Sequence, residues 1–242
     1  MVYPLHRYRS FANLTLAEEQ ALLELGDPPV VHHRGETFQR EGESVQGFYL
    51  HIAGWIISSV VLRNGDRLIQ KVHLPGDMLG TPNAVLAKTA DSLTAITEAT
   101  TAFVPFARFG QIFVDLPRLG ALFTVAIQME RLRLLDMLAT SQNASSSERL
   151  AQFLLDLYQR LETIGFVEGD AFHIPLTQEQ MGDLLGITPV HMNRTLRTFD
   201  KNGWIARYDH HVKLLDIAAL RAISPLPLRC PAFEPSWLPS AR

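Results

Sequence analysis

Two short helices joined by a glycine turn constrain this chain more than any other feature of its sequence. Thr177 is a residue type that caps a helix start, and Gln180 stands three positions later, which is the spacing of a capping box. Gly186 ends that helix, and Thr188 followed by Pro189 favours the start of a second one. The sequence therefore predicts a helix-turn-helix in this segment.

The predicted second helix has one apolar and one polar face. Met192, Leu196 and Phe199 recur at spacings of four and three residues and would face inward. The opposite face would then be free to enter the major groove of DNA, where Arg194 could donate two hydrogen bonds to one guanine. The residues expected to contact bases or phosphates, including those of a following hairpin, are Thr177, Gln178, Thr188, Val190, His191, Asn193, Arg194, Arg197, Lys201, Arg207, His210, His211 and Lys213.

The charge of the chain supports this prediction only locally. The formal net charge is −3, so the chain lacks the strongly basic balance that would by itself indicate a nucleic-acid partner. Between Thr188 and Lys213, however, five Lys or Arg residues stand against two Asp residues. A basic patch is therefore expected on the second helix and on the hairpin at residues 204–215.

The N-terminal half of the chain predicts β-structure. From Arg34 to Gly80, short β-branched and aromatic runs alternate with glycines, which is typical of short strands joined by tight turns. Asn64-Gly65-Asp66 is a hairpin signal of the type I′ kind, and further strands are expected from Ser92 to Phe106. These segments predict an all-β roll of roughly 100 residues. Residues 14–25 begin with a capping box and predict a short helix ahead of the roll.

A long amphipathic helix is expected from Leu116 to Gln142, because apolar residues recur there every three or four positions. Such a stripe could cover its own domain or pair with a second copy of the chain. The small polar run from Ser141 to Ser147 follows it and is the predicted hinge. The predicted division is a roll at 1–115, a long helix at 116–142, a winged helix-turn-helix at 143–223 and an irregular, proline-rich tail at 224–242.

The cysteine count and the hydropathy pattern exclude several protein classes. Cys230 is the single cysteine, which excludes an intrachain disulfide and a cysteine-held iron–sulfur cluster. No apolar stretch approaches the roughly 20 residues that span a bilayer, and the first ten residues lack a signal-peptide layout. We therefore expect a cytoplasmic protein of the α+β class with no membrane partner.

Two segments resemble the CRP/FNR family of bacterial transcription regulators: the roll ending in Gly76-Asp77-Met78-Leu79-Gly80, and the run TQEQMGDLLGITPVHMNRTLRTF from Thr177. The resemblance implies a cyclic-nucleotide-binding-like effector domain and a homodimer formed through the long helix. It also implies a palindromic operator with half-sites roughly 34 Å apart, and contact with RNA polymerase. The helix residues expected at the dimer interface are Leu119, Leu122, Ala126, Met129 and Leu132.

The chain departs from the family's ligand-binding pattern. Cyclic-AMP-binding members hold the phosphate with an Arg-Ser pair and the ribose with a Glu, where this chain has Asp91-Ser92 and Thr81. An aspartate would repel the phosphate, which argues against a cyclic nucleotide. Leu134 and Leu135, at the positions that read the adenine, carry no hydroxyl group. Haem-bearing relatives use Cys and His near the Gly-Asp turn, where this chain has Gly and Pro, and haem held by another residue stays open.

The sequence thus predicts a dimeric DNA-binding regulator whose roll senses an unidentified small molecule, with no resident cofactor or metal. Alternatives are the same regulator acting without an effector, or a cyclic-nucleotide- or haem-responsive member with atypical residues. No nucleophile and base set or phosphate-cradling loop indicates an enzyme. The operator and the direction of regulation stay open. The residues expected to line an effector pocket are Met78, Leu79, Thr81, Asn83, Ser92, Leu93, Leu134 and Leu135.

Overall fold

The computed structural model describes residues 2–241, which form two compact units. One unit extends to Gln128 and also includes the residues from Pro231 onward, and the other comprises Met129–Cys230. The division therefore falls inside the long helix α4 (Pro117–Asn143) rather than at the polar run after it. The first half of α4 belongs to the N-terminal unit because its apolar side chains are buried there.

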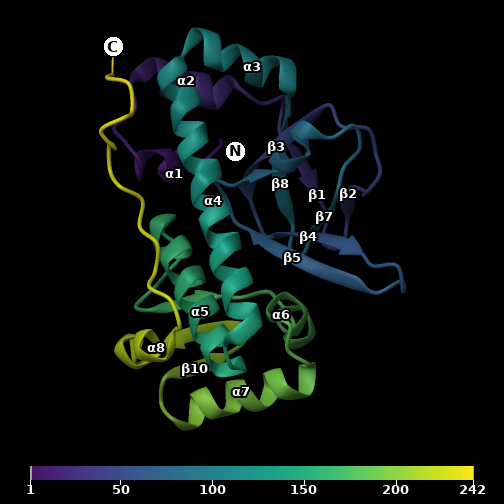
Figure 1. Cartoon of the computed structure of the whole chain (residues 1–242), viewed down its shortest axis with the longest axis vertical. Helices are drawn as coiled ribbons and strands as arrows, with labels where there is room; N and C mark the ends of the chain where they lie inside the picture. The colour runs from purple at the N-terminus through teal and green to yellow at the C-terminus, as the bar shows by residue number, and fades with distance from the viewer. Residues whose placement is uncertain (1, 242) are drawn as a thin grey trace. The chain divides into compact units, whose positions relative to one another are not determined.

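The N-terminal unit contains the predicted roll, built from two four-stranded antiparallel sheets (Figure 1). Their strands are short and their turns are tight, as the spacing of glycines predicts. The first sheet has the order β1 (Val30–His32), β8 (Ala99–Pro105), β3 (Gly47–Ala53) and β6 (Met78–Leu79). The second has the order β2 (Thr37–Gln39), β7 (Ser92–Ala95), β4 (Ile56–Val61) and β5 (Arg67–His73).

The hairpin between β4 and β5 corrects one expectation. A type I′ turn needs positive φ at both central residues, but in this turn only Gly65 has a positive φ, at 89°. The Asn64 side chain instead accepts a hydrogen bond from the Asp66 N–H at 3.1 Å, which stabilises an ordinary right-handed turn. The hairpin forms where it was expected, with a different turn geometry.

Helices cover the ends of the roll. The helix α2 (Leu16–Glu24) begins with the predicted capping box, in which Thr15 and Glu18 exchange hydrogen bonds with each other's backbone N–H groups. The helix α3 (Phe106–Asp115) was not predicted, and it begins directly after β8. The unit also contains the short helix α1 (His6–Arg9) and the 3₁₀ turn η1 (Thr81–Val85).

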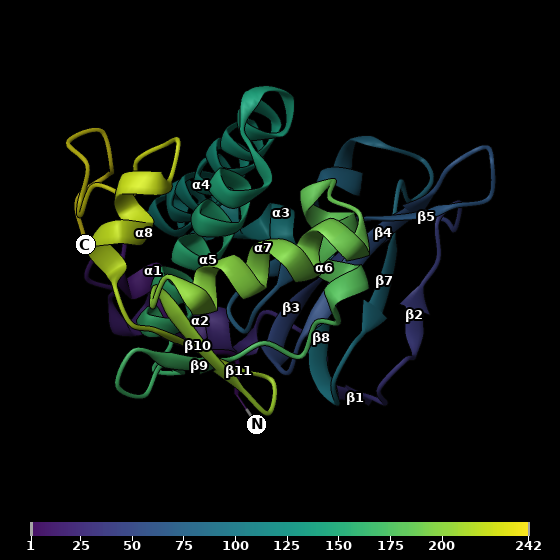
Figure 2. The same ribbon diagram turned by 90° about the horizontal axis from the view of Figure 1, so that it is seen from below.

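The second unit contains the predicted helix-turn-helix and hairpin, with a three-stranded sheet beside the helices, and it ends in a helix, α8, that was not predicted (Figure 2). Its strands follow the order β10, β11, β9, so the hairpin pairs with an earlier strand through β11. After α4, the elements are α5 (Ser146–Thr163), β9 (Ala171–His173), α6 (Gln178–Leu185), α7 (Pro189–Lys201), β10 (Ile205–Tyr208), β11 (His211–Leu214) and α8 (Ile217–Ile223).

The tail after Ile223 contains no helix or strand up to residue 241, as predicted. Its last part nevertheless packs within the N-terminal unit. The Glu234 N–H donates to the Phe11 carbonyl at 2.7 Å, and its carboxylate accepts from the Asn13 backbone and side chain. Among the helices described, none is both long and apolar enough to cross a membrane.

Candidate nucleic-acid interface and effector pocket

The predicted helix-turn-helix is formed by α6 and α7. Thr177 and Gln180 make the capping box of α6, and Gly186 ends that helix in the left-handed conformation with φ of 61°. The Ile187 N–H then returns to the Gly182 carbonyl at 2.8 Å, and Ile187 is buried between the helices. Thr188 caps α7 by accepting from the backbone N–H three residues later. Each local signal read from the sequence therefore has its expected structural role.

Gly182 is the point of closest approach in this turn, and it predicts a sensitive position. A Cβ atom there would lie 2.5 Å from the Ile187 carbonyl oxygen, a backbone atom that cannot move aside alone. We expect Gly182→Ala to destabilise the second unit by about 1–3 kcal/mol in urea unfolding, as overpacking does. The matched control is Gly110→Ala in α3, where nothing lies within 4 Å of a new Cβ. An unchanged unfolding midpoint for Gly182→Ala would contradict the packing described here.

The two faces of α7 are divided as predicted. Met192, Leu196 and Phe199 are at most 1% exposed and hold the helix against its unit. Val190, at the first turn, is 83% exposed, although it is apolar. The side chains of Arg194 and Arg197 are also exposed. The outer face of α7 therefore carries two guanidinium groups and an apolar group at its N-terminal end.

Several predicted contact residues have partners within their own unit. The Asn193 side-chain amide donates to the Gln178 side chain at 2.8 Å, so α6 orients the polar end of α7. His191 Nε2 and Ser146 Oγ lie 2.7 Å apart, which fixes the imidazole of that residue. Ser146 had no sequence signal for this role, because its partner is 45 residues away.

Two arginines have structural roles that the sequence did not reveal. Two nitrogens of Arg207, Nη2 and Nε, donate hydrogen bonds to Asp200 Oδ2, at 2.6 and 3.1 Å. The phosphate contact predicted for Arg207 therefore competes with an internal ion pair. Arg149 in α5 donates to the carbonyls of Leu185 and Gly186, at 2.8 and 3.2 Å. It thereby satisfies the C-terminal end of α6. Lys201 and Lys213 are exposed.

The hairpin after α7 closes through a two-residue turn with the positive φ values of the type I′ geometry. Asp209 and His210 join β10 to β11, and both have positive φ values, 41° and 59°. These values belong to the left-handed region that non-glycine residues seldom adopt. His173 of β9 pairs with His211 across the sheet, a neighbour that no sequence pattern indicated.

Among residues 2–241, no group of three or more His, Cys, Asp or Glu side chains is arranged to hold a metal ion.

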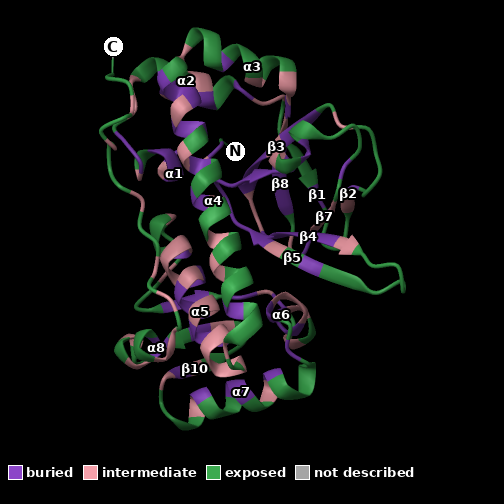
Figure 3. Ribbon diagram, in the orientation of Figure 1, coloured by how far each residue is buried: buried purple, intermediate pink, exposed green. Residues whose placement is uncertain are grey.

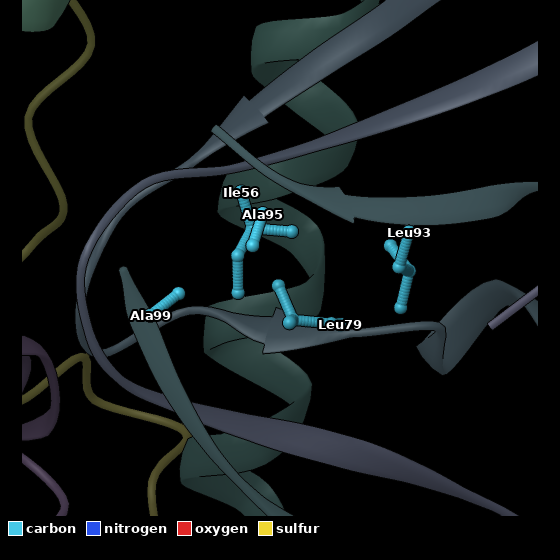
Figure 4. Packing of buried hydrophobic residues seen from close by; sticks show 5 residues of the cluster. All are labelled: Ile56, Leu79, Leu93, Ala95 and Ala99. Carbon is cyan, nitrogen blue, oxygen red and sulfur yellow. The ribbon is translucent and has the colours of Figure 1, made fainter. Parts of the chain in front are cut away.

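The interior of the roll is apolar where an effector pocket was expected. Leu79 and Leu93 are fully buried and pack with Ile56 and Ala95, which Figure 4 shows. Met78 was wrongly assigned to this interior, because neighbouring strand residues point to opposite faces. Its sulfur instead accepts a hydrogen bond from the Tyr8 hydroxyl at 3.3 Å.

A polar network closes one corner of the roll. Asn83 Nδ2 donates to the Asp91 carboxylate at 3.1 Å, and Gln39 Nε2 donates to the same oxygen at 3.3 Å. Asn83 Oδ1 also accepts from the Ala90 N–H at 2.9 Å. Burial raises the pKa of Asp91 above its usual value, and the hydrogen bond from Asn83 opposes this shift. The expected pocket residue Asn83 therefore lies beside a carboxylate that the chain itself satisfies.

The Gly-Asp turn before β6 is linked to α4 through a buried arginine. Arg7 forms an ion pair with Asp77, and its other terminal nitrogen donates to the Ala126 carbonyl of α4 at 3.4 Å. The Tyr3 hydroxyl donates to the Gly76 carbonyl at 2.7 Å. These contacts connect the roll to the long helix within one unit.

The faces of α4 correct the predicted dimer interface. Leu119, Leu122 and Ala126 are fully buried and Met129 is 7% exposed, so these residues already pack within their own chain. The first half of the helix is therefore a covering helix, the alternative that the periodicity left open. Leu132, at 42% exposure, is the one member of the expected set on an accessible surface.

Much of the second half of α4 is exposed (Figure 3). From Ile127 onward, the helix carries several exposed apolar residues. Ile127, Leu134 and Leu138 recur at spacings of seven and four residues, so they lie on one face, with Leu135 at its edge. Each is between 38% and 56% exposed. We refer to these four residues as the exposed face of α4. Leu134 and Leu135, which were expected in the effector pocket, belong to this face.

The chain matches two domain families in the order that the structure shows. Residues 29–115 match the cyclic nucleotide-binding domain, and residues 148–223 match the Crp-like helix-turn-helix domain. Similar solved structures include FixK2 from Bradyrhizobium japonicum, with a TM-score of 0.74 at 19% identity, covering 83% of this chain and 98% of that chain. The fold and the helix-turn-helix together define a DNA-binding regulator with a sensor-type roll.

Curated relatives identify the family. The transcriptional regulatory protein btr of Bordetella pertussis is 27% identical over 206 residues, which cover 85% of each chain. The fumarate and nitrate reduction regulatory protein of Escherichia coli is 24% identical over 191 residues, covering 79% of this chain and 76% of that protein. Both names describe regulatory proteins. The chain belongs to the CRP/FNR family of transcription regulators.

Proposed function

We propose that this regulator reads a palindromic DNA site as a homodimer, with one α7 helix in each of two major-groove half-sites. The observation that carries the proposal is the exposed outer face of α7, where Val190, Arg194 and Arg197 stand on a helix whose other face is buried. An arginine at this position can bind guanine O6 and N7, and a valine can contact a thymine methyl group. The helix-capping residues Thr177 and Thr188, with Gln178, Lys201 and Lys213, would contact phosphates.

The dimer would form through the exposed face of α4. Apolar residues at heptad-like spacing on a helix that is half exposed favour pairing with an identical helix. A two-fold axis between such helices would place the two α7 helices on half-sites about one DNA turn, roughly 34 Å, apart. Transcription would then depend on contact with RNA polymerase, in the cytoplasm where bacterial DNA lies. We assign no enzymatic role to the chain.

The roll would act either as a sensor of an uncharged or cationic small molecule or as a scaffold without an effector. The residues present do not fit a cyclic phosphate, because Asp91 places a carboxylate at the polar corner. Its network of internal hydrogen bonds and the closed apolar interior support the second alternative. Native mass spectrometry of freshly purified protein would separate them, since a retained ligand adds a defined mass to the dimer.

Arg194→Ala tests the proposed recognition helix. A preferred duplex is first selected with the wild-type protein from a random double-stranded library, and its affinity is then measured by gel shift. We expect the variant to bind that duplex more weakly by about 1–3 kcal/mol per half-site and to lose selectivity at the contacted base pair. Removing a bidentate donor removes both affinity and discrimination at one position.

Arg221→Ala in α8 is the matched control, because it removes one exposed basic residue outside α7. Its affinity for the selected duplex should stay close to that of the wild type. Unchanged affinity and selectivity in Arg194→Ala would contradict the docking proposed here. Failure of the wild-type protein to enrich any sequence would contradict specific DNA binding itself.

A further inference from the structure

The hairpin sheet carries a row of aromatic and imidazole side chains, two of which, His210 and His211, are among the expected phosphate contacts. Tyr208 of β10 pairs with His211 of β11, and His211 pairs with His173 of β9, so the three lie side by side across three strands. The rings of Tyr208 and His211 are stacked, with centroids 5.4 Å apart and an interplanar angle of 10°. The rings of His173 and His211 lie 5.2 Å apart.

His210 adds a third imidazole at the tip of the sheet. Its ring centroid is 6.3 Å from that of His173, and its backbone is held in the left-handed conformation by the two-residue turn. The backbone carbonyl of His210 accepts from the Ile174 N–H at 2.7 Å, which fixes the tip against the end of β9. Three histidines from two strands and a turn are thus gathered in one place, which we call the histidine row: His173, His210 and His211.

The charged groups around the histidine row allow it to carry a strong positive charge when the imidazoles are protonated. Lys213 lies two residues from His211 on the same face of the sheet, since strand side chains alternate. Asp209 is the acidic group beside the histidines. On the opposite face, the charge of Arg207 is paired with Asp200 of α7. At the other end of β9, Asp170 accepts a hydrogen bond from Tyr158 of α5 at 2.7 Å.

His211 and His210 hinder the protonation of His173 in the free protein. Burial lowers the pKa of His173 below its usual value of 6.5, and the neighbouring His211 and His210 lower it further, whereas Asp209 opposes the shift. A polyanion brought against this face would reverse the balance, because phosphate charges favour the protonated imidazole. The protein should therefore take up protons when such a polyanion binds.

We propose that the histidine row is a second DNA-backbone contact, which binds phosphates in its protonated form and makes DNA affinity depend on pH. The sheet directly follows α7, and Trp204 at its start packs on Phe199 of that helix with ring centroids 5.1 Å apart. The row therefore belongs to the same rigidly packed unit as the groove-reading face. This inference rests on the proposed function, because it takes DNA as the ligand of that unit.

The sign of the dependence follows from the lowered pKa of His173. DNA binding raises the pKa of a group that is mostly neutral at pH 7 in the free protein, so affinity rises as pH falls through the pKa of the complex. The rise stops below the pKa of the free protein, where both states are protonated. Each proton taken up contributes a factor of about ten in affinity per pH unit within that window.

The test measures the Kd of the selected duplex by fluorescence anisotropy from pH 8.5 to pH 5.5 at constant ionic strength. We expect the wild-type affinity to rise on acidification by about tenfold or more over the range. The variant His173→Gln should show a shallower slope, and the variant with all three histidines of the row replaced by Gln should lose most of it. The ratio of each variant's Kd to that of the wild type should be smaller at pH 8.5 than at pH 5.5.

Two controls locate the effect. His33→Gln removes an exposed histidine from β1's end in the other unit and should keep the wild-type slope. His191→Gln removes the one histidine of α7. If this variant lost the pH dependence of the Kd and the triple variant kept it, the inference would be overturned. A wild-type Kd that does not change with pH would also overturn it. Absence of duplex binding at every pH would refute the proposed function, which is a distinguishable result.

Discussion

Replacing Leu134 and Leu138 with aspartate should convert the protein from a dimer to a monomer. Both side chains lie on the exposed face of α4, and two carboxylates there would have to be buried without partners in a paired helix. A monomer binds one half-site at a time and loses the gain from simultaneous engagement, which is about 10²–10⁴-fold for linked sites. We therefore expect the affinity for the selected palindromic duplex to fall by about that factor.

The matched control for this double variant is Asn143→Asp, which places a carboxylate at an exposed position on the opposite side of the same helix from Leu134. It should remain dimeric in multi-angle light scattering and should retain DNA affinity. The circular dichroism of both variants should match the wild type. A double variant that stays dimeric would show that the copies associate through some other surface.

Removing the buried arginine at the start of α4 should cost the N-terminal unit about 3–5 kcal/mol of unfolding free energy. Arg118 donates to both oxygens of the Glu18 carboxylate, at 2.9 and 2.7 Å, and also to the Asn13 carbonyl at 3.1 Å. Arg118→Met keeps most of the volume of the side chain but leaves the Glu18 carboxylate buried without its counter-charge. Urea unfolding followed through Trp55, which is buried in the roll, measures the loss.

Two further variants distinguish this effect from a general loss of charge. Arg9→Met breaks the exposed ion pair with Glu19, and such pairs contribute at most about 1 kcal/mol. Adding Glu18→Gln to Arg118→Met removes the uncompensated charge and should recover part of the lost stability. If Arg9→Met and Arg118→Met were equally destabilising, the buried pair would have no special role.

The sequence was most informative where the physical cause is local. The capping boxes at Thr15 and Thr177 form as predicted, and the pair Ser145 and Glu148 forms a third, because each depends on two side chains that are three residues apart. The left-handed Gly186 ends α6 for a similarly local reason. With the glycine-separated strands of the roll and the apolar period of the long helix, these local signals predicted the three parts of the chain in order.

The unpredicted helix α3 begins without a capping signal. Its N-cap is Pro105, which makes no side-chain cap, and the predicted strands ended at Phe106 with no element assigned from there to Asp115. Phe109 packs edge to face on Phe48 and on Phe123, with ring centroids 5.0 Å apart in each case. Phe106, Phe109 and Phe113 recur at spacings of three and four residues, so the helical period was present in the sequence and was missed. The contacts that stabilise the helix come from residues distant in the sequence.

In the candidate sites, too, some features follow from local sequence patterns and others depend on the tertiary structure. The periodicity of the sequence determined which side of α7 is buried and that α4 is a long amphipathic helix. Only the tertiary structure decided that Leu119, Leu122 and Ala126 face their own chain, and that His173 joins the histidines of the hairpin. Periodicity specifies the faces of an element because neighbours along a helix or strand have fixed directions. The partner of each face depends on contacts between residues far apart in the sequence, which only the folded chain brings together.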